Sequence, residues 1–335
     1  MDHFINIPVD HAGVIPDPRL AGAVSDAMTQ PFQFTDVFVY VHGWWTSEAD
    51  SMSEYTRFSV EFVKSLCGFE DSILLNPPLS SLGIGVHWPS VLSEDKLQVL
   101  NLFEPLSYYQ MERRSDDVGL NALYALFQLL FSTRRKDSQC FRLTLIGHSF
   151  GCRSLCRALN RLRSELDKSK VDQELKQFVL TSRINLVLLQ AAIESEELDK
   201  GGAYGNIALF PSLRILATRS DLDTALGKLF PLAERLNILR LHGDSRVALG
   251  YAGPTKKTTR RYSGRTLSIG PGFQPQNANL QDISSRLVVA DLTPLHRASS
   301  YPARPLRGHH SDIFLPEIYR LIAGFSFELK GPPNA

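Results

Sequence analysis

Residues 141–151 of this chain read FRLTLIGHSFG, and this stretch determines the expected fold. Leu143 and Leu145 belong to a run of β-forming residues, which predicts a buried strand. The run ends in the G-x-S-x-G pattern of residues 147–151, and a helical pattern continues to residue 166. This order of patterns predicts a strand, a sharp turn and a helix, with a serine at the turn.

Ser149 stands at that turn, where its hydroxyl would be lifted clear of the sheet. Glycines on either side permit the close backbone approach that such a strained turn requires. The helix that begins here directs its positive end, and the amide of Phe150, toward an anion formed at the serine. Ser149 is therefore the candidate nucleophile and Phe150 a candidate oxyanion donor. The alternative is a glycine-rich turn in which the serine only caps the helix.

Length, composition and charge limit the classes of protein that fit this chain. It has 335 residues, of which 43% are hydrophobic, so it can bury a sizeable core in one large or two small domains. With 36 basic and 35 acidic residues, the formal net charge of +1 indicates neither a nucleic-acid partner nor an acidic substrate. No signal-peptide pattern opens the chain, and no uncharged apolar stretch approaches the length of a membrane span. We therefore expect a cytoplasmic protein without a membrane span; these patterns leave the oligomeric state open.

The four cysteines show no C-x-x-C pairing and are too few to staple a chain of this length. Cys152 and Cys156 are one helical turn apart after the candidate nucleophile, so we expect them to pack that helix against the sheet. Neither a metal nor an organic cofactor is expected.

Short β-rich runs alternate with amphipathic stretches along the chain. The predicted strands cover residues 36–42, 83–88, 141–147, 183–190, 213–218 and 286–290. The predicted helices cover residues 47–66, 116–131, 149–166, 224–236 and 312–325. Such alternation predicts an α/β fold with a mostly parallel central sheet and helices on both faces. A single domain over residues 1–335 is expected, with an irregular insert at about residues 242–285.

The insert contains the basic run KKTTRR at residues 256–261. Long loops in compact domains often lie over active sites, so this run could belong to a lid or bind phosphate. The alternative is a solvated surface loop. Both interpretations stay open.

A second group of candidate residues lies in the sequence VHGWW, residues 41–45, at the end of a predicted strand. Gly43 would allow the loop to bend so that the backbone amide of Trp44 faces the serine and supplies a second oxyanion donor. His42 is expected to orient this loop rather than to carry protons. One of two adjacent tryptophans should line the acyl pocket, and we place Trp45, together with His42, around the substrate.

A serine nucleophile needs a histidine base, and that histidine needs an acid to hold its tautomer. In a parallel sheet of this kind the chain order is nucleophile, acid, histidine. Beyond the serine, His242 precedes the last predicted strand and His296 follows it too closely. The pair in GHHSD, residues 308–312, is better placed, and His310 is preferred to His309 because a predicted helix follows it directly.

Two aspartates, Asp221 and Asp223, follow the predicted strand 213–218 at its carboxyl end. Asp223 precedes a helical pattern and could be only its N-cap, whereas Asp221 lies closer to the strand and could be a surface turn residue. Asp244 lies beyond the next helix and is a weaker candidate. The residues themselves leave the choice between Asp221 and Asp223 open.

Together and in this order, the motifs resemble the α/β-hydrolase superfamily and, within it, an uncharacterised bacterial serine-esterase-like group. The resemblance covers most of residues 36–325 and rests on VHGWW, HWPS (residues 87–90), GHSFG, SDLDTAL (residues 220–226) and GHHSDIF (residues 308–314). The doubled tryptophan, the extra aspartate and the doubled histidine depart from the pattern of the group.

The resemblance implies Ser149 as nucleophile, His310 as base and Asp223 as acid. It also implies the amides of Trp44 and Phe150 as oxyanion donors. The expected activity is that of a serine hydrolase, which cleaves a small-molecule carboxylic ester through an acyl-enzyme. Two alternatives remain: a lipase or phospholipase with a mobile lid, and a catalytically silent α/β-hydrolase fold used as a binding module. A complete set of candidate triad residues argues against the binding module, and the fold alone does not name the substrate.

Overall fold

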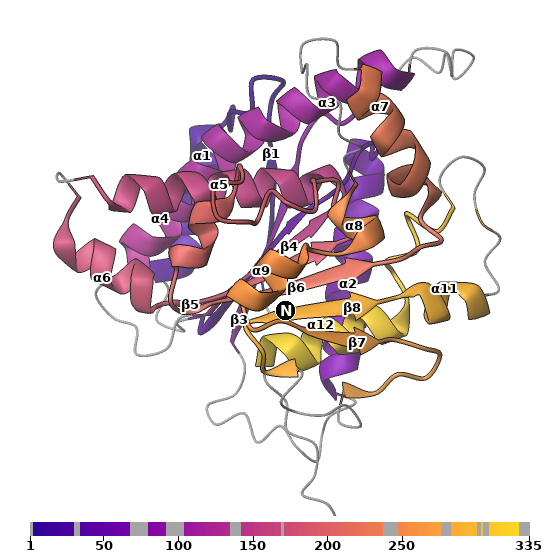
Figure 1. The fold of residues 1–335 in the computed structure, drawn as a ribbon. Helices are drawn as coiled ribbons and strands as arrows, with labels where there is room; N and C mark the ends of the chain where they lie inside the picture. The colour runs from indigo at the N-terminus through magenta and orange to yellow at the C-terminus, as the bar shows by residue number, and fades with distance from the viewer. Residues whose placement is uncertain are drawn as a thin grey trace, which may run out of the picture.

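The computed structural model describes residues 3–29, 34–67, 80–91, 104–134, 142–168, 171–236, 247–275, 283–299, 303 and 308–327. These residues form an eight-stranded sheet in the order β1-β3-β2-β4-β5-β6-β8-β7, and every pair of neighbouring strands is parallel (Figure 1). The strands are β1 (His3–Pro8), β2 (Asp36–Val41), β3 (Ser81–His87), β4 (Arg142–His148), β5 (Arg183–Leu189), β6 (Leu213–Arg219), β7 (Arg265–Ser268) and β8 (Leu287–Asp291). The expected α/β architecture with a parallel sheet is confirmed, and it is consistent with an α/β-hydrolase-like fold.

The central strands are apolar along nearly their whole length. All six residues of β2 are buried, and β4 and β5 each leave only their first residue partly exposed. Strands covered on both faces need no polar side, so their sequences do not alternate. All six predicted strands are present, with bounds that differ by one or two residues. The structure adds two strands that were not predicted, β1 and β7, which form the two edges of the sheet.

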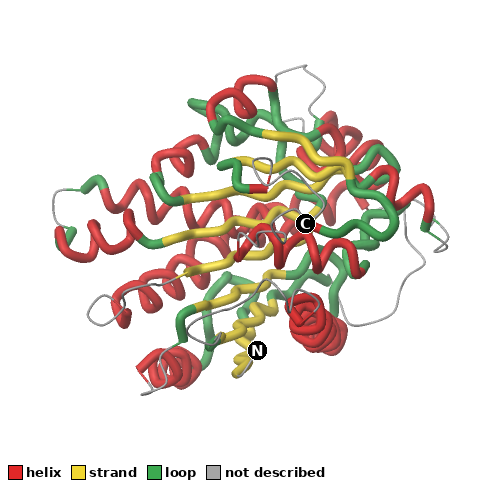
Figure 2. The backbone as a smooth tube through the Cα atoms, turned by 90° about the horizontal axis from the view of Figure 1, so that it is seen from below, coloured by secondary structure: helices red, strands yellow, loops and turns green. Residues whose placement is uncertain are grey.

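Helices cover both faces of the sheet, as expected (Figures 1 and 2). One face carries α1 (Pro18–Thr29), α3 (Glu104–Val118), α4 (Tyr124–Arg134), α5 (Phe150–Leu166) and α6 (Gln173–Thr181). The other face carries α2 (Glu48–Cys67) and α12 (Pro316–Phe327). Strand β2 shows the division, because Val37 and Val39 pack in the first layer whereas Phe38 and Tyr40 pack in the second.

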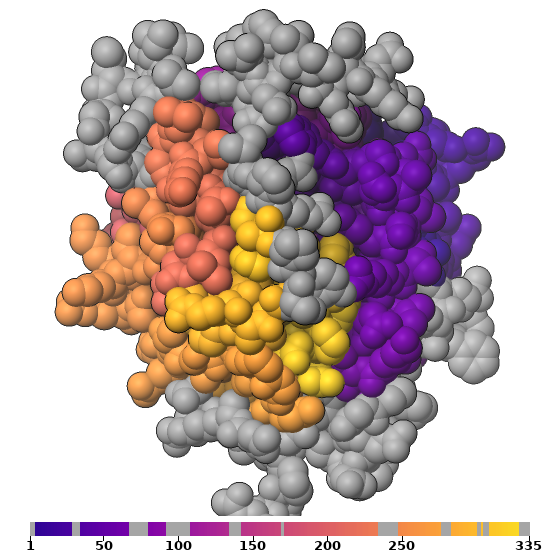
Figure 3. Space-filling model, turned by 90° about the vertical axis from the view of Figure 1, so that its right-hand side faces the viewer, coloured from indigo at the N-terminus to yellow at the C-terminus, as the bar shows by residue number. Residues whose placement is uncertain are grey.

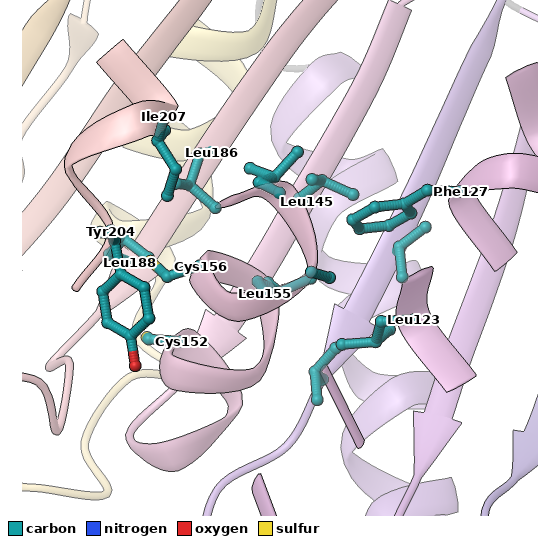
Figure 4. Close-up of a cluster of buried hydrophobic side chains, with 14 of the residues drawn as sticks. Leu123, Phe127, Leu145, Cys152, Leu155, Cys156, Leu186, Leu188, Tyr204 and Ile207 are labelled. Carbon is teal, nitrogen blue, oxygen red and sulfur yellow. The ribbon is translucent and has the colours of Figure 1, made fainter. Parts of the chain in front are cut away.

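Helix α5 lies directly on the sheet and positions the end of β4. Cys152, Leu155 and Cys156 point from α5 into a cluster that includes Leu145 and Leu186 (Figure 4). Both cysteines are fully buried free thiols, and burial raises the pKa of each well above its ordinary value. They therefore pack the helix onto the sheet as small apolar residues. The side chain of Cys67 and all of Cys140 lie outside the described residues.

Two predicted helices have different bounds in the structure. The helix expected at residues 116–131 is the second half of a longer run, in which α3 and α4 join through a π-helical turn, Gly119–Leu123. The polar sequence of α3 hides its helical pattern. A side chain at position 119 would meet the Ser154 carbonyl oxygen at 2.5 Å, so the glycine permits close packing on α5. The helix expected at residues 312–325 begins only at Pro316, since proline favours the first helical turn.

The insert expected to be irregular contains short regular elements in the described residues 247–275. They include α8 (Leu249–Ala252), α9 (Lys256–Arg261) and β7, which extends the sheet beside β8. The basic run KKTTRR is α9. Its N-cap residue is Thr255, and the Thr255 hydroxyl donates to Asp199 at 2.6 Å. The remaining short helical segments are Gly205–Leu209, Ala225–Leu229, α7 (Phe230–Leu236) and α11 (Thr293–Ala298).

Candidate active site

The candidate residues follow the carboxyl ends of neighbouring strands. Parallel strands end at the same edge of a sheet, so the loops after β2, β4, β5 and β6 meet there. Figure 3 shows the side of the molecule on which α7 and α11 lie in Figure 1. On that face residues 220–236 (salmon), 308–327 (yellow) and 36–67 (violet) gather around one region.

Ser149 occupies the expected sharp turn between β4 and α5. Its backbone has φ 53° and ψ −119°, a conformation that L-residues rarely adopt. A side chain at Gly147 would meet the Cys152 amide nitrogen at 2.6 Å, and one at Gly151 would meet the Val41 carbonyl oxygen at 2.2 Å. Both glycines are therefore required by close backbone contact, which is the reason given for them from the sequence.

A chain of hydrogen bonds joins Ser149, His310 and Asp223. The His310 Nδ1 atom lies 2.7 Å from Asp223 Oδ2, and its Nε2 atom lies 2.9 Å from Ser149 Oγ. A carboxylate only accepts, so Nδ1 carries the proton and Nε2 is free to accept from the serine hydroxyl. The three residues come from the loops after β4, after β6 and before α12, and the structure brings them together.

Asp223 performs two structural tasks at once. Its side chain is completely buried; Oδ1 accepts the backbone amide of Leu226 at 3.0 Å, while Oδ2 holds His310. The same carboxylate therefore makes the contact that each interpretation requires, one to a helical amide and one to a histidine. Asp221 is exposed, and its backbone amide donates to the Thr293 hydroxyl at 3.1 Å. Of the two aspartates, the structure places Asp223 beside His310.

The neighbouring histidine forms a separate pair. His309 Nδ1 lies 2.6 Å from Asp312 Oδ2, and its ring stacks on His296 at a centroid distance of 5.2 Å. His296 in turn bonds the Ser220 hydroxyl at 2.9 Å. His309 thus points away from Ser149 into a buried polar cluster. His242 and Asp244, the other weaker candidates, lie outside the described residues.

Gly43 brings the loop after β2 against the nucleophile. A side chain at this position would lie 3.0 Å from the Ser149 Cβ atom and 2.8 Å from His148 Nδ1. The ring of Trp44 packs edge-on against Phe150 at 6.1 Å. Phe150 is the first residue of α5, so its amide has no intrahelical acceptor. The loop and the helix N-terminus thus face the same serine.

His42 lies behind this loop, where it bonds Gly43 and Trp88. That it surrounds the substrate stays a prediction from the sequence. Its side chain is completely buried and stacks on Trp88 with an interplanar angle of 8°. Nδ1 donates to the Gly43 carbonyl oxygen at 2.8 Å, and Nε2 accepts the Trp88 amide at 3.1 Å. Burial lowers the pKa of His42 to about 3, so its ring is neutral at ordinary pH. The orienting role expected from the sequence agrees with these contacts.

Trp45 remains the exposed member of the tryptophan pair. Its side chain is 42% exposed, and its backbone has φ 65°. The Trp45 amide donates to the Ser90 carbonyl oxygen at 3.2 Å, which ties the loop to the HWPS motif. Its indole is thus on the surface two residues beyond the glycine that touches Ser149.

Two residues near the site gave no functional signal in the sequence. His148 directly precedes the nucleophile, and its Nε2 atom donates to the His310 carbonyl oxygen at 3.0 Å. Gln190 follows β5, and its Nε2 atom donates to the His309 carbonyl oxygen at 3.1 Å. Both bonds join residues more than a hundred positions apart, and local patterns carry no information on such contacts.

No metal cluster accompanies this site within the part of the chain that the structure describes: no three His, Cys, Asp or Glu side chains there are arranged to hold an ion. Among the described helices, none combines the length and the apolar character that a membrane crossing requires. Comparisons with protein-family models, with curated proteins and with solved structures found no match for this chain.

Proposed function

We propose that this protein is a serine hydrolase that cleaves a carboxylic ester. The observation that carries the proposal is the hydrogen-bonded chain Ser149, His310, Asp223 at a strained turn between a parallel strand and a helix. Nucleophile, base and orienting acid in this geometry are the requirements for acyl transfer to a serine.

In the proposed reaction, Ser149 Oγ attacks the ester carbonyl carbon while His310 Nε2 takes the hydroxyl proton. The tetrahedral intermediate then collapses, and His310 returns the proton to the leaving alcohol. Water next attacks the acyl-enzyme and gives a proton to His310, which passes it to Ser149 Oγ as the bond to the acyl carbon breaks and the acid is released. Asp223 holds the imidazole in the required tautomer and stabilises it when it is charged. These steps need no metal or organic cofactor.

The proposed oxyanion donors are the amides of Phe150 and Trp44. For Trp44, the support comes from His42, whose Nδ1–H bond fixes the Gly43 carbonyl group. In a trans peptide the carbonyl and the following N–H point in opposite directions. Holding the Gly43 carbonyl toward the buried His42 therefore turns the Trp44 amide toward the opposite side of the loop. Since the His42 ring is neutral and fully bonded, this orientation is preorganised, as oxyanion stabilisation requires.

The substrate class is proposed from the same surroundings. Aromatic rings of Trp44, Phe150 and Tyr108 pack together beside the nucleophile, and Trp45 is exposed next to them. Aromatic surroundings of this kind favour an apolar acyl or alcohol group of the substrate over a charged one. A cytoplasmic location and a small-molecule substrate stay predictions from the sequence.

Hydrolysis of p-nitrophenyl esters of increasing acyl length tests the proposal. The wild-type protein is expected to hydrolyse at least one member of the series, and Ser149→Ala is expected to reduce the rate to background. A folded wild-type protein that hydrolyses none of them would favour the binding-module alternative. A folded Ser149→Ala variant with the wild-type rate would place the chemistry elsewhere.

A further inference from the structure

We infer that Gln190 is a positioning residue, which fixes the general base relative to the nucleophile; this inference rests on the proposed function. Gln190 is the first residue after β5, and its side chain is completely buried. It does not touch Ser149 or the His310 ring by any hydrogen bond in the described structure. Its contacts instead reach the backbone next to each of the two residues.

The turn that contains Gln190 is bonded to the nucleophile on two sides. The Ser149 amide donates to the Leu189 carbonyl oxygen at 3.0 Å, and the Ala192 amide donates to the Ser149 carbonyl oxygen at 3.2 Å. The residues immediately around Gln190 therefore fix the backbone of Ser149.

The side chain of the same residue extends to the segment that carries the base. Gln190 Nε2 donates to the His309 carbonyl oxygen at 3.1 Å, on the peptide that leads directly into His310. The His309 amide donates to the Leu222 carbonyl oxygen at 3.3 Å, so this segment is held from the β6 side as well. Gln190 thus links the nucleophile's turn to the base's segment through one side chain.

The backbone of Gln190 is unfavourable for glutamine. Its φ is 43°, in the left-handed region where glycine is preferred. The Gln190 amide donates to the Thr218 hydroxyl at 2.8 Å, and this bond holds the turn in that conformation. Gly250 permits the turn to pack closely, because a side chain there would meet the Gln190 carbonyl carbon at 2.4 Å. Glycine would relieve the strain but could not reach His309. A strained residue that keeps a long side chain is typical of a functional constraint.

The side-chain amide is also incompletely satisfied. Within the described residues, Gln190 Oε1 is buried and has no hydrogen-bond partner. Burying such a group is unfavourable, and an apolar side chain of the same size would avoid it. Strain and desolvation together oppose glutamine here, whereas the bond to the His309 carbonyl favours it. The 2.9 Å separation of Ser149 Oγ and His310 Nε2 is what that bond helps to maintain.

Gln190→Met tests the inference, because methionine has nearly the same size and no donor. We expect kcat to fall by roughly 10- to 100-fold with KM unchanged, since small misplacements of reacting groups have effects of this size. The rate of labelling by a fluorophosphonate probe should fall by the same factor. The matched control is Asn185→Leu on the same strand, where the Asn185 amide donates to the Ser326 carbonyl oxygen at 3.3 Å, far along β5 from the site. This control should keep the wild-type kcat.

Gln190→Glu supplies a readout that a purely structural role would not change. A protonated carboxyl group donates to the His309 carbonyl, whereas a carboxylate repels it, so the ratio of variant to wild-type activity should fall as pH rises from 5 to 9. Equal labelling of wild type and Gln190→Met overturns the inference and leaves the proposed function standing. If Gln190→Met does not fold, a flat activity ratio for Gln190→Glu overturns it instead. A folded wild-type protein that does not react with the probe overturns the proposed function, and the inference with it.

Discussion

Strands β4 and β5 each hold the C-terminal part of the chain twice, once at each end. Near their starts, Arg142, the first residue of β4, and Asn185, the third residue of β5, donate to the Ser326 carbonyl oxygen at the end of α12. At the other end, His148, the last residue of β4, and Gln190, the first residue after β5, donate to the carbonyl oxygens of His310 and His309. The bonds are alike: in each case a buried or half-buried side chain reaches a main-chain acceptor. Their surroundings differ.

Strain is concentrated at the carboxyl end of the sheet. Of the four described non-glycine residues with positive φ, Trp45, Ser149 and Gln190 each follow a strand at this end. At the opposite end, side chains satisfy the last carbonyls of a regular helix, which lack intrahelical partners. Similar hydrogen bonds are therefore expected to have different consequences. The bonds to Ser326 should affect stability alone, whereas the bonds to His309 and His310 should affect the reaction.

The largest expected effect separates the two adjacent histidines. His310→Ala should lower kcat by roughly 10⁴- to 10⁶-fold, because removing a triad base leaves only oxyanion stabilisation and binding. His309→Ala is the matched control, since its ring bonds Asp312 and stacks on His296. Steady-state kinetics of the two variants check the ranking. A larger loss for His309→Ala would transfer the role to that residue.

The two aspartates provide the next contrast. Asp223→Asn should lower kcat by roughly 10⁴-fold, because an amide would favour the wrong tautomer of His310. Asparagine also caps helices well, so the melting temperature should change little. Asp221→Asn, at an exposed position, should leave kcat unchanged. If kinetics instead showed Asp221→Asn to be the inactive variant, the acid assignment would be wrong.

Lowering the pH should reduce the free energy of unfolding through the buried His42. Its pKa is about 3 in the folded protein against 6.5 ordinarily, so between these pH values the unfolded chain takes up a proton that the folded protein does not. The stability that His42 contributes is therefore complete above about pH 6.5 and is lost as pH falls below it. Between pH 7.5 and 5 the loss should be about 2 kcal/mol.

Urea unfolding of wild type and His42→Asn at these two pH values measures that contribution. The variant should lose about 2 kcal/mol less than the wild type on acidification. His11→Asn, at an exposed position, serves as the control and should lose as much as the wild type. Identical losses in all three proteins would show that His42 is protonated equally in the folded and unfolded states.

At the opposite end, a large effect on stability and none on activity is expected. Arg142 pairs with the buried Asp36 at 2.8 Å, and Arg142→Met would remove this ion pair and leave the carboxylate its bond to the Thr35 hydroxyl. The free energy of unfolding should fall by about 3 kcal/mol while kcat stays at the wild-type value. Arg19→Met is the control, because the pair of Arg19 and Asp17 is solvent-exposed and should contribute little to stability. A matching fall in kcat for folded Arg142→Met would remove the distinction between the two ends.

Much of the fold could be predicted because it is encoded locally. The apolar runs of β2, β4 and β5 and the glycines around Ser149 each have a local physical cause, and the predicted elements match them. The edge strands were missed because strands that are partly exposed carry little apolar pattern. The helical segments in the insert were missed for a similar reason, since each has six residues or fewer.

The candidate site divides in the same way. Ser149 could be proposed from its motif alone. The choice between Asp221 and Asp223 depends on which carboxylate reaches the histidine, and the residues themselves left it open. Asp223 and His310 are 87 positions apart, so no local pattern records their contact. Gln190 carries no motif at all. Its importance follows from a bond across 119 positions and from a backbone angle, neither of which is visible in a sequence.

The most direct test of the central claim is the stoichiometry and position of covalent modification by a fluorophosphonate. The probe reacts with a serine only when a neighbouring base activates it. We predict one adduct per chain by intact mass, located on Ser149 by peptide mapping, and no adduct on folded Ser149→Ala. An adduct on another residue, or equal modification of wild type and Ser149→Ala, would contradict the account.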